Sequence, residues 1–274
     1  MTATVTDFHY GAVTPIVAYL MACVGAALGL RCTTRSLRRV RRRTGWLSLG
    51  AVSIGCGIWT MHFIAMAGFS VDGATVGYDP MYTLLSLIVA IVVVAIGLFW
   101  VGFRGGSTVN LAVAGVFTGL GVAAMHYLGM AAIRTHGIIH YNVWTVFLSV
   151  LIAVLAATAA LWAAVSINGV WWSLGASIVM GVAVTGMHYT GMAAVSVHVM
   201  NGVSAPGTST STLAFPLLML AGPLVALLIA SAIVMFDPDM MLGEGEWVQQ
   251  TPTAGRAPAP IHQPVQSGQS YTSW

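Results

Sequence analysis

Thr185-Gly186-Met187-His188-Tyr189-Thr190-Gly191-Met192-Ala193-Ala194 is one of three copies of a pattern around which this chain is organised. The earlier copies read Thr60-Met61-His62-Phe63-Ile64-Ala65-Met66-Ala67 and Ala124-Met125-His126-Tyr127-Leu128-Gly129-Met130-Ala131. Each copy has the form Met-His-aromatic-x-x-Met-Ala, and the histidines recur after 64 and then 62 residues. A pattern that returns at a nearly constant period predicts a fold built from repeated units.

The composition places these repeats in a lipid bilayer. Of the 274 residues, 58% are hydrophobic and only 6% are charged, whereas a soluble domain carries far more charge. A spanning helix needs about 20 mostly apolar residues, and the sequence therefore predicts an all-α integral membrane protein with seven transmembrane helices. The expected spans are residues 12–31, 46–69, 81–103, 109–133, 143–167, 170–196 and 213–236.

The arginines predict how the chain crosses the membrane. All ten basic residues are arginines, and seven of them lie between residues 31 and 43, in the first connection. Because positive residues of short loops stay in the cytoplasm, we expect this connection on the cytoplasmic side of the membrane, with the N-terminus outside and the C-terminus inside. The expected parts are an outer lead (1–11), a seven-helix membrane domain (12–236) and a disordered cytoplasmic tail (237–274) rich in Pro, Gln, Gly and Ser.

The repeats predict three helical pairs followed by a single helix. The second, fourth and sixth spans carry the motif, and their many glycines favour a place at the centre of the bundle. The odd spans also resemble one another, since Tyr78-Asp79 and Tyr141-Asn142 stand 63 residues apart. We interpret Asp79 as the N-terminal cap of the third span. Three further histidines are expected in solvated outer loops: His136, His140 and His198.

Each motif places a histidine and a methionine four residues apart, and hence on one helix face. An ionisable residue within a span is rare and is functional by default, so three histidines at one depth in the outer half of the membrane predict one or two metal sites. Imidazole suits several transition metals, whereas a thioether selects copper, above all Cu(I). The sequence therefore predicts a copper site. The candidate ligands are His62, Met66, His126, Met130, His188 and Met192, and the second choices are Met61, Met125 and Met187.

The three motif copies are similar to those of the bacterial MHYT domain family. The resemblance extends over residues 8–236 and includes the Gly-x-Trp-x-Met-His lead that ends at His62. It implies a sensor module of the bacterial cytoplasmic (inner) membrane that binds copper near the outer face through the motif His and Met residues named above. It also implies sensing of a diatomic gas such as oxygen, carbon monoxide or nitric oxide. Many members continue into an enzyme, kinase or DNA-binding domain. In this sequence the expected disordered tail follows instead, so the signal is expected to pass to a separate cytoplasmic signalling partner.

Two other functions remain open at this point. Copper transport or delivery would use the same soft ligands, although the matched depth of the histidines disfavours a path across the membrane. A bis-His haem protein would use histidines on neighbouring helices, although the methionine four residues on gives haem no benefit. The sequence has no nucleophile elbow, phosphate loop, paired catalytic carboxylates or redox cysteine pair. We therefore expect neither an enzyme nor a nucleic-acid partner.

Overall fold

Seven long α-helices make up most of the computed structural model, which describes residues 2–3, 5–7, 9–38, 40–71, 76–135, 137–167, 169–199 and 211–236. The expected tail over residues 237–274 and the expected loop histidine His136 lie outside the described residues. The helices are α1 (Val13–Arg38), α2 (Arg43–Ala67), α3 (Pro80–Arg104), α4 (Thr108–Ala131), α5 (Val143–Ser166), α6 (Val170–Met192) and α7 (Ser211–Met235).

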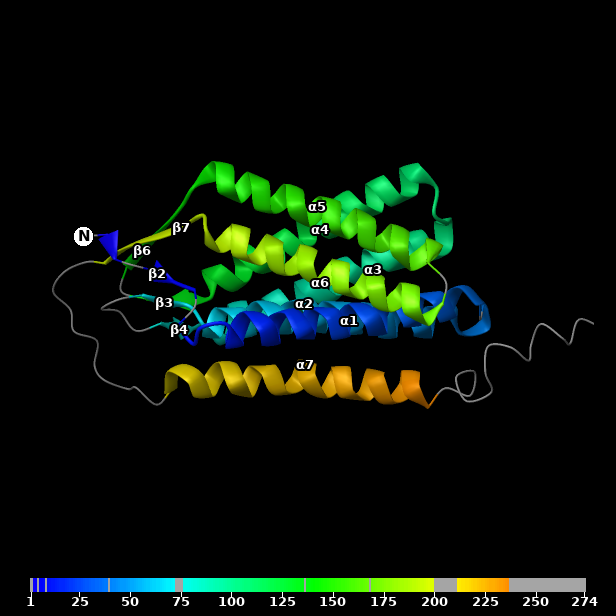
Figure 1. Cartoon of the computed structure of the whole chain (residues 1–274), viewed down its shortest axis with the longest axis horizontal. Coiled ribbons are helices and arrows are strands. Elements are labelled where there is room, and N and C mark those ends of the chain that lie inside the picture. The colour runs from blue at the N-terminus through cyan, green and yellow to red at the C-terminus, as the bar shows by residue number, and fades with distance from the viewer. Residues whose placement is uncertain are drawn as a thin grey trace, which may run out of the picture. The chain divides into compact units, whose positions relative to one another are not determined.

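All seven helices are long and apolar enough to cross a membrane. Lipid offers no hydrogen-bond partners to the backbone, so a spanning segment must pair its peptide groups internally, and a helix does so within one segment. The helices run roughly along one common direction (Figure 1). The prediction of an all-α, multi-pass membrane protein with seven spans is confirmed.

The helix ends differ from the expected ones by up to three residues in most places and by more at two ends. The first helix continues to Arg38 through the arginine-rich stretch, because arginine is a good helix former outside the apolar region as well. A short 3-10 turn (Val40–Arg42) then leads directly into α2. The sixth helix ends at Met192 and not at residue 196, because the chain turns there into a strand.

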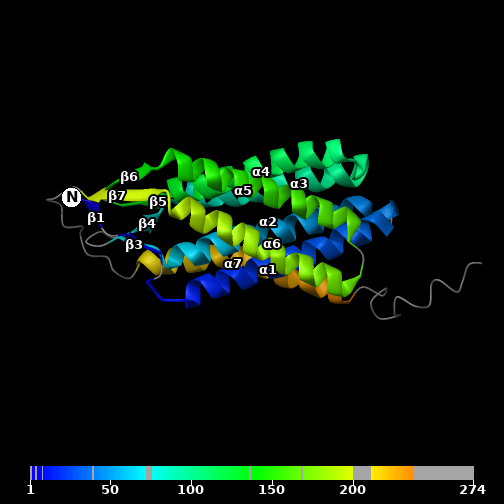
Figure 2. The ribbon, with the colours of Figure 1, turned by 45° about the horizontal axis from the view of Figure 1, so that its top comes forward.

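The first six helices form a closed ring. Each of them packs against the next in the sequence, and α6 packs back against α1, while α7 lies outside the ring and packs mainly against α2 (Figure 1, Figure 2). Close approach of α1 and α2 depends on glycine, since a Cβ atom on Gly25 would lie 2.7 Å from the Cα atom of Gly57. The pairs α1–α2, α3–α4 and α5–α6 are thus three repeats around one approximate three-fold axis.

The expected central position of the even helices is correct for α2 only. Most side chains along α2 are buried. By contrast, α4 and α6 expose large apolar side chains such as Phe117 and Val179, which suits contact with lipid. The difference follows from the ring, in which an even helix turns its motif face inward and its opposite face outward.

A layer of short strands covers one end of the ring (Figure 1). Strand β7 (Val195–Val199) pairs antiparallel with β1 (Thr2–Ala3) on one side and with β6 (Gly137–Tyr141) on the other. Two further antiparallel pairs join β2 (Val5–Thr6) to β3 (Ser70–Val71) and β4 (Gly77–Tyr78) to β5 (Ile133–Arg134).

The strand layer corrects the expectation that His140 and His198 lie in loops. His140 belongs to β6 and His198 to β7, where their backbones pair with Ser196 and Ile138 respectively. The alternation of valine with polar residues in β7 is typical of a strand with one buried face, and Val197 is indeed buried. This strand-bearing end is the end at which the motif histidines lie.

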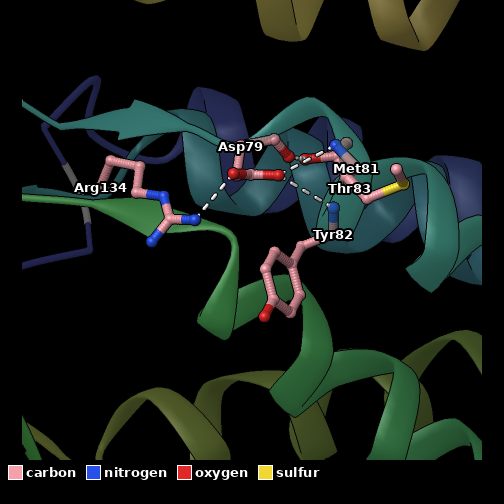
Figure 3. A network of polar contacts seen from close by, with 5 residues as sticks. All are labelled: Asp79, Met81, Tyr82, Thr83 and Arg134. Atoms are coloured by element: carbon pink, nitrogen blue, oxygen red, sulfur yellow. Dashed lines mark hydrogen bonds and ion pairs between the residues drawn. The ribbon is translucent and has the colours of Figure 1, made fainter.

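Polar caps fix where α3 and α5 begin at the strand-bearing end. The carboxylate of Asp79 accepts hydrogen bonds from the backbone N–H groups of Met81 (2.9 Å) and Tyr82 (3.2 Å), which confirms the expected cap. Its other oxygen accepts a hydrogen bond of 2.7 Å from Arg134, in β5 (Figure 3). Asn142 caps α5 in the same way, as the repeat predicts.

The ion pair between Asp79 and Arg134 predicts a pH dependence of stability. The hydrogen bond from Arg134, followed by that from the backbone of Tyr82, lowers the pKa of the Asp79 carboxyl below 3.8. A lowered pKa in the folded protein means a contribution to stability that is complete above pH 3.8 and is lost as the pH falls through the folded pKa. Thermal unfolding followed by circular dichroism should therefore give Asp79→Asn a lower melting temperature than the wild type at pH 7.

The same difference between the two proteins should shrink as the pH falls below 3.8 and through the lowered pKa of Asp79, where the folded wild-type carboxylate takes up its proton. Asparagine keeps the capping oxygen, so the substitution tests the charge and not the cap. Arg134→Gln is the matched change on the other partner and should behave alike. A difference between wild type and Asp79→Asn that stays constant between pH 7 and pH 3 would contradict a role for this ion pair.

Candidate metal centre

Three histidines, one from each repeat, meet on the axis of the ring. His62 comes from α2, His126 from α4 and His188 from α6, and each is only 1% exposed. Their Nδ1 atoms form a triangle with sides of 3.0 Å (His62 to His188), 3.2 Å (His62 to His126) and 3.3 Å (His126 to His188). The repeats therefore build one site and not two. These three residues are called the His triad below.

The Nδ1 atoms of the His triad lie within hydrogen-bond distance of one another, whereas the Nε2 atoms of His62 and His126 are buried without a partner in the described part of the protein. A neutral imidazole carries a proton on only one of its two nitrogens. If the proton is on Nε2, three Nδ1 lone pairs face one another. If it is on Nδ1, the Nε2 atoms of His62 and His126 are buried lone pairs that lack a hydrogen-bond partner in the described part of the protein. In the first arrangement, a cation between the three Nδ1 atoms would relieve this repulsion.

The size of the triangle suits a small transition-metal ion. A tetrahedral ion with metal–nitrogen distances of about 2.0–2.1 Å places its nitrogen ligands about 3.3 Å from one another, close to the sides of the triangle. Among the described residues, the His triad is the one group of three or more His, Cys, Asp or Glu side chains placed to share an ion. The buried His triad could therefore hold one metal ion.

Two glycines allow the imidazoles to approach one another. A Cβ atom on Gly129 would collide with Nε2 of His62, and a Cβ atom on Gly191 would collide with Nε2 of His126. Each glycine lies three residues after the histidine of its own repeat, so the imidazole of one repeat packs on the backbone of the next. The motif pattern alone assigns no role to Gly129 and Gly191. The signal in the sequence for this packing is a glycine at the same motif position in two of the three copies.

The methionines that follow the histidines form a second layer. Met66, Met130 and Met192 lie one helical turn beyond the His triad and are almost fully buried. They pack into one apolar cluster that also contains Phe69 and Val197. This cluster separates the His triad from the strand layer. The structure thus gathers the three expected methionine partners on one side of the His triad, and they are called the Met layer below.

The methionines that precede the histidines are not gathered. All three are buried, but Met61 packs with Ala18 and Ala22 of α1, whereas Met125 and Met187 belong to the main apolar core of the ring. The structure does not bring Met61, Met125 and Met187 together, and packing accounts for their burial.

Hydrogen bonds across the ring hold the motif helices in place. The indole N–H of Trp59 donates to the hydroxyl of Ser86 on α3 at 2.9 Å. In the next repeat, the hydroxyls of Tyr127 and Ser149 share a hydrogen bond of 2.6 Å. Tyr78, in β4, also donates to the backbone carbonyl of Met66 at 3.1 Å. An even helix is therefore tied to the odd helix that follows it, close to the His triad.

The comparison with known families agrees with this arrangement. The sequence model of the MHYT family, described as a bacterial signalling protein N-terminal repeat, matches residues 55–115 and 119–177. The chain belongs to the MHYT family. The third motif copy of this MHYT protein, around His188, lies beyond the two matched ranges, and the structure places it beside the other two.

Several signalling proteins resemble this MHYT protein. It is 37% identical over 228 residues to MucR of Pseudomonas aeruginosa, a bifunctional diguanylate cyclase/cyclic di-GMP phosphodiesterase, a match that covers 81% of this chain and 33% of MucR. It is 35% identical over 191 residues to the cyclic di-GMP phosphodiesterase NbdA of the same organism, covering 68% of this chain and 24% of NbdA. It is 28% identical over 200 residues to the signalling protein YkoW of Bacillus subtilis, covering 69% of this chain and 24% of YkoW.

These likenesses define the class of the protein. The chain spans about a third of MucR and about a quarter of NbdA and YkoW, so the activities of those whole proteins are not carried over with the match. No solved structure matches the chain. The chain is thus a multi-pass membrane module of the MHYT signalling family with a buried His triad that could bind a metal.

Proposed function

We propose that this MHYT protein is a membrane sensor in which the His triad holds one copper ion. The observation that carries the proposal is the meeting of three buried Nδ1 atoms at 3.0–3.3 Å from one another. Imidazole alone suits several transition metals, but the neighbouring Met layer offers thioethers, which favour copper, above all Cu(I). Neutral ligands also suit this depth, because a buried carboxylate or thiolate is costly to desolvate.

The signal that fits this site best is a diatomic gas or a change in copper redox state. Copper supplies an electron-rich centre that can bind a molecule such as oxygen, carbon monoxide or nitric oxide, or can change its charge. The His triad supplies three nitrogens and leaves at least one coordination position open. The Met layer remains a candidate source of a further ligand, with Met66, Met130 and Met192 in equivalent positions on the three repeats.

Transmission to other parts of the protein follows from where the three imidazoles are attached. A change in the preferred spacing of the His triad acts on α2, α4 and α6 at once, and a ligand that favours one spacing shifts the population of helix arrangements. We propose that the strand-bearing end faces the outside of the bacterial inner membrane and that the shift is felt at the cytoplasmic ends of these helices. A separate cytoplasmic signalling protein, such as one with the cyclic di-GMP activities for which MucR and NbdA are named, would receive it.

The two alternative functions fit the geometry less well. Copper transport needs ligands staggered along a path, whereas the His triad lies at one level between the Met layer and an apolar core. A bis-His haem needs two imidazoles on opposite faces of a macrocycle. Three imidazoles whose Nδ1 atoms are 3.0–3.3 Å apart leave no gap for one. Both observations favour a compact copper site that binds a small ligand.

Infrared spectroscopy of the protein with carbon monoxide tests the proposal. The purified full chain is reduced, loaded with Cu(I) and exposed to carbon monoxide. We expect one carbon monoxide per chain and a stretching band that shifts when the gas is labelled with carbon-13. The band should be absent from His188→Ala. Uptake of copper into vesicles that contain the protein, or a haem absorption band in the protein as purified, would contradict the sensor proposal and support one of the alternatives.

A further inference from the structure

An apolar cavity lies inside the ring about one helical turn from the His triad, on the side opposite the Met layer, and Met187 is the lining residue that adjoins a triad histidine in the sequence. Its volume is about 50 Å³. The even helices line it with equivalent residues. Four positions before each triad histidine these are Ile58, Val122 and Val184, and eight positions before they are Ile54, Thr118 and Met180. Because residues four apart share a helix face, the same three faces that carry the His triad continue into the cavity.

Small side chains on α5 keep this space open. Ala153, Ala157, Ala160 and Ala164 follow one another at helical spacing along the wall that α5 presents to the cavity. The other helices contribute larger residues such as Leu98. An alanine wall opposite branched side chains leaves a volume that neighbouring groups do not fill, and such an unfilled volume lowers stability unless something occupies it.

Water is a poor occupant of this cavity. About 10–15 Å³ would suffice for one water, but a buried water also needs two to four polar partners. Among the described residues that line the cavity, Thr118 is the one with a polar side chain, and its hydroxyl donates to the carbonyl of Val93 at 3.5 Å. Cavities lined in this way stay dry and take up small apolar molecules.

We propose that the cavity is a docking site for small apolar molecules of a few heavy atoms that dissolve in the bilayer and reach the His triad from its apolar side. The proposal rests on the proposed function for its consequence at the metal, but not for the binding itself. The volume corresponds to roughly three or four water-sized spheres. This is enough for a diatomic molecule or a single xenon atom, and it excludes an acyl chain. The Met layer packs on the other side of the His triad, so a molecule held in the cavity would approach the triad past the residues that line the near end of the cavity, Ile58, Val122, Val184 and Met187.

Xenon is the probe that tests the docking site without any metal. Xenon NMR of the metal-free full chain in lipid nanodiscs should show saturable binding in the wild type. Ala157→Phe places a large ring in the cavity and should weaken xenon binding roughly tenfold or more. Ala159→Phe makes the same change on the exposed side of α5, outside the residues that line the cavity, and should leave xenon binding unchanged. If Ala157→Phe fails to fold, Ala156→Leu fills the same wall with a smaller group.

A second measurement uses the copper-loaded protein and follows the rate at which carbon monoxide binds. Ala157→Phe should slow the association of carbon monoxide with the copper roughly tenfold, while the copper content stays at the wild-type level. Ordered water in the cavity, or xenon binding that Ala157→Phe and Ala156→Leu leave intact, would overturn the docking site. Xenon binding in a protein whose copper takes up no carbon monoxide would instead leave the docking site standing and contradict the proposed function.

Discussion

His126→Ala is expected to remove the bound metal almost completely. The substitution deletes one of three Nδ1 ligands and leaves a gap that the remaining two imidazoles cannot close. Loss of a group that merely supports a metal ligand costs about 10–100-fold in affinity, so loss of a ligand itself should exceed that range. Metal analysis of the purified variant after loading with Cu(I) and removal of excess metal is the measurement.

The effect on folding should be smaller than the effect on metal binding. Removing a buried side chain costs a few kcal/mol, but His126→Ala also relieves the crowding of three Nδ1 atoms in the metal-free protein. The helical circular dichroism spectrum should therefore survive. His140→Ala, in β6, is the matched control and should retain full metal content. Wild-type copper content in His126→Ala would show that the His triad is not the binding site.

Gly191→Ala is expected to have the second-largest effect, although it adds a single methyl group. The added Cβ atom would collide with Nε2 of His126, so the imidazole must shift, and its spacing from the other two imidazoles changes. Overpacking of this kind costs about 1–3 kcal/mol. We expect a lower melting temperature together with a loss of copper affinity of roughly tenfold or more.

The same helix offers a control of opposite sign. A Cβ atom on Gly186 meets nothing within 4 Å, so Gly186→Ala should stabilise α6 slightly, since alanine is favoured over glycine in helices by about 1 kcal/mol. Its copper affinity should equal that of the wild type. Equal effects of Gly186→Ala and Gly191→Ala on melting temperature and copper binding would contradict the close packing of His126 on the backbone of α6.

The His triad could be predicted from the sequence because repetition carries three-dimensional information. A nearly constant period places His62, His126 and His188 at equivalent points of three similar units, and equivalent points of a closed ring lie around its axis. Apolar runs of about 20 residues likewise predict the spans without knowledge of their packing. The capping role of Asp79 was also predictable, because a cap depends only on the residues that directly follow it in the sequence.

Other features depend on packing between distant segments and leave little trace in the sequence. Strands of two residues, such as β4 and β5, have no periodic pattern to detect, and they form because the helix ends bring them together. The outward face of α4 and α6 follows from the closure of the ring, which glycine content alone does not predict. The cavity requires alanines on α5 to lie opposite larger residues from other helices. The role of Gly191 requires His126 to be its neighbour.

X-ray absorption spectroscopy of copper in the purified wild-type protein tests the central claim most directly. The claim is that the Nδ1 atoms of the His triad, which lie 3.0–3.3 Å apart, share one ion. It predicts one copper per chain and a first shell dominated by three nitrogen scatterers from imidazole, at about 2.0 Å, with at most one sulfur from the Met layer. A protein without copper, or a first shell made mainly of sulfur, would contradict the claim.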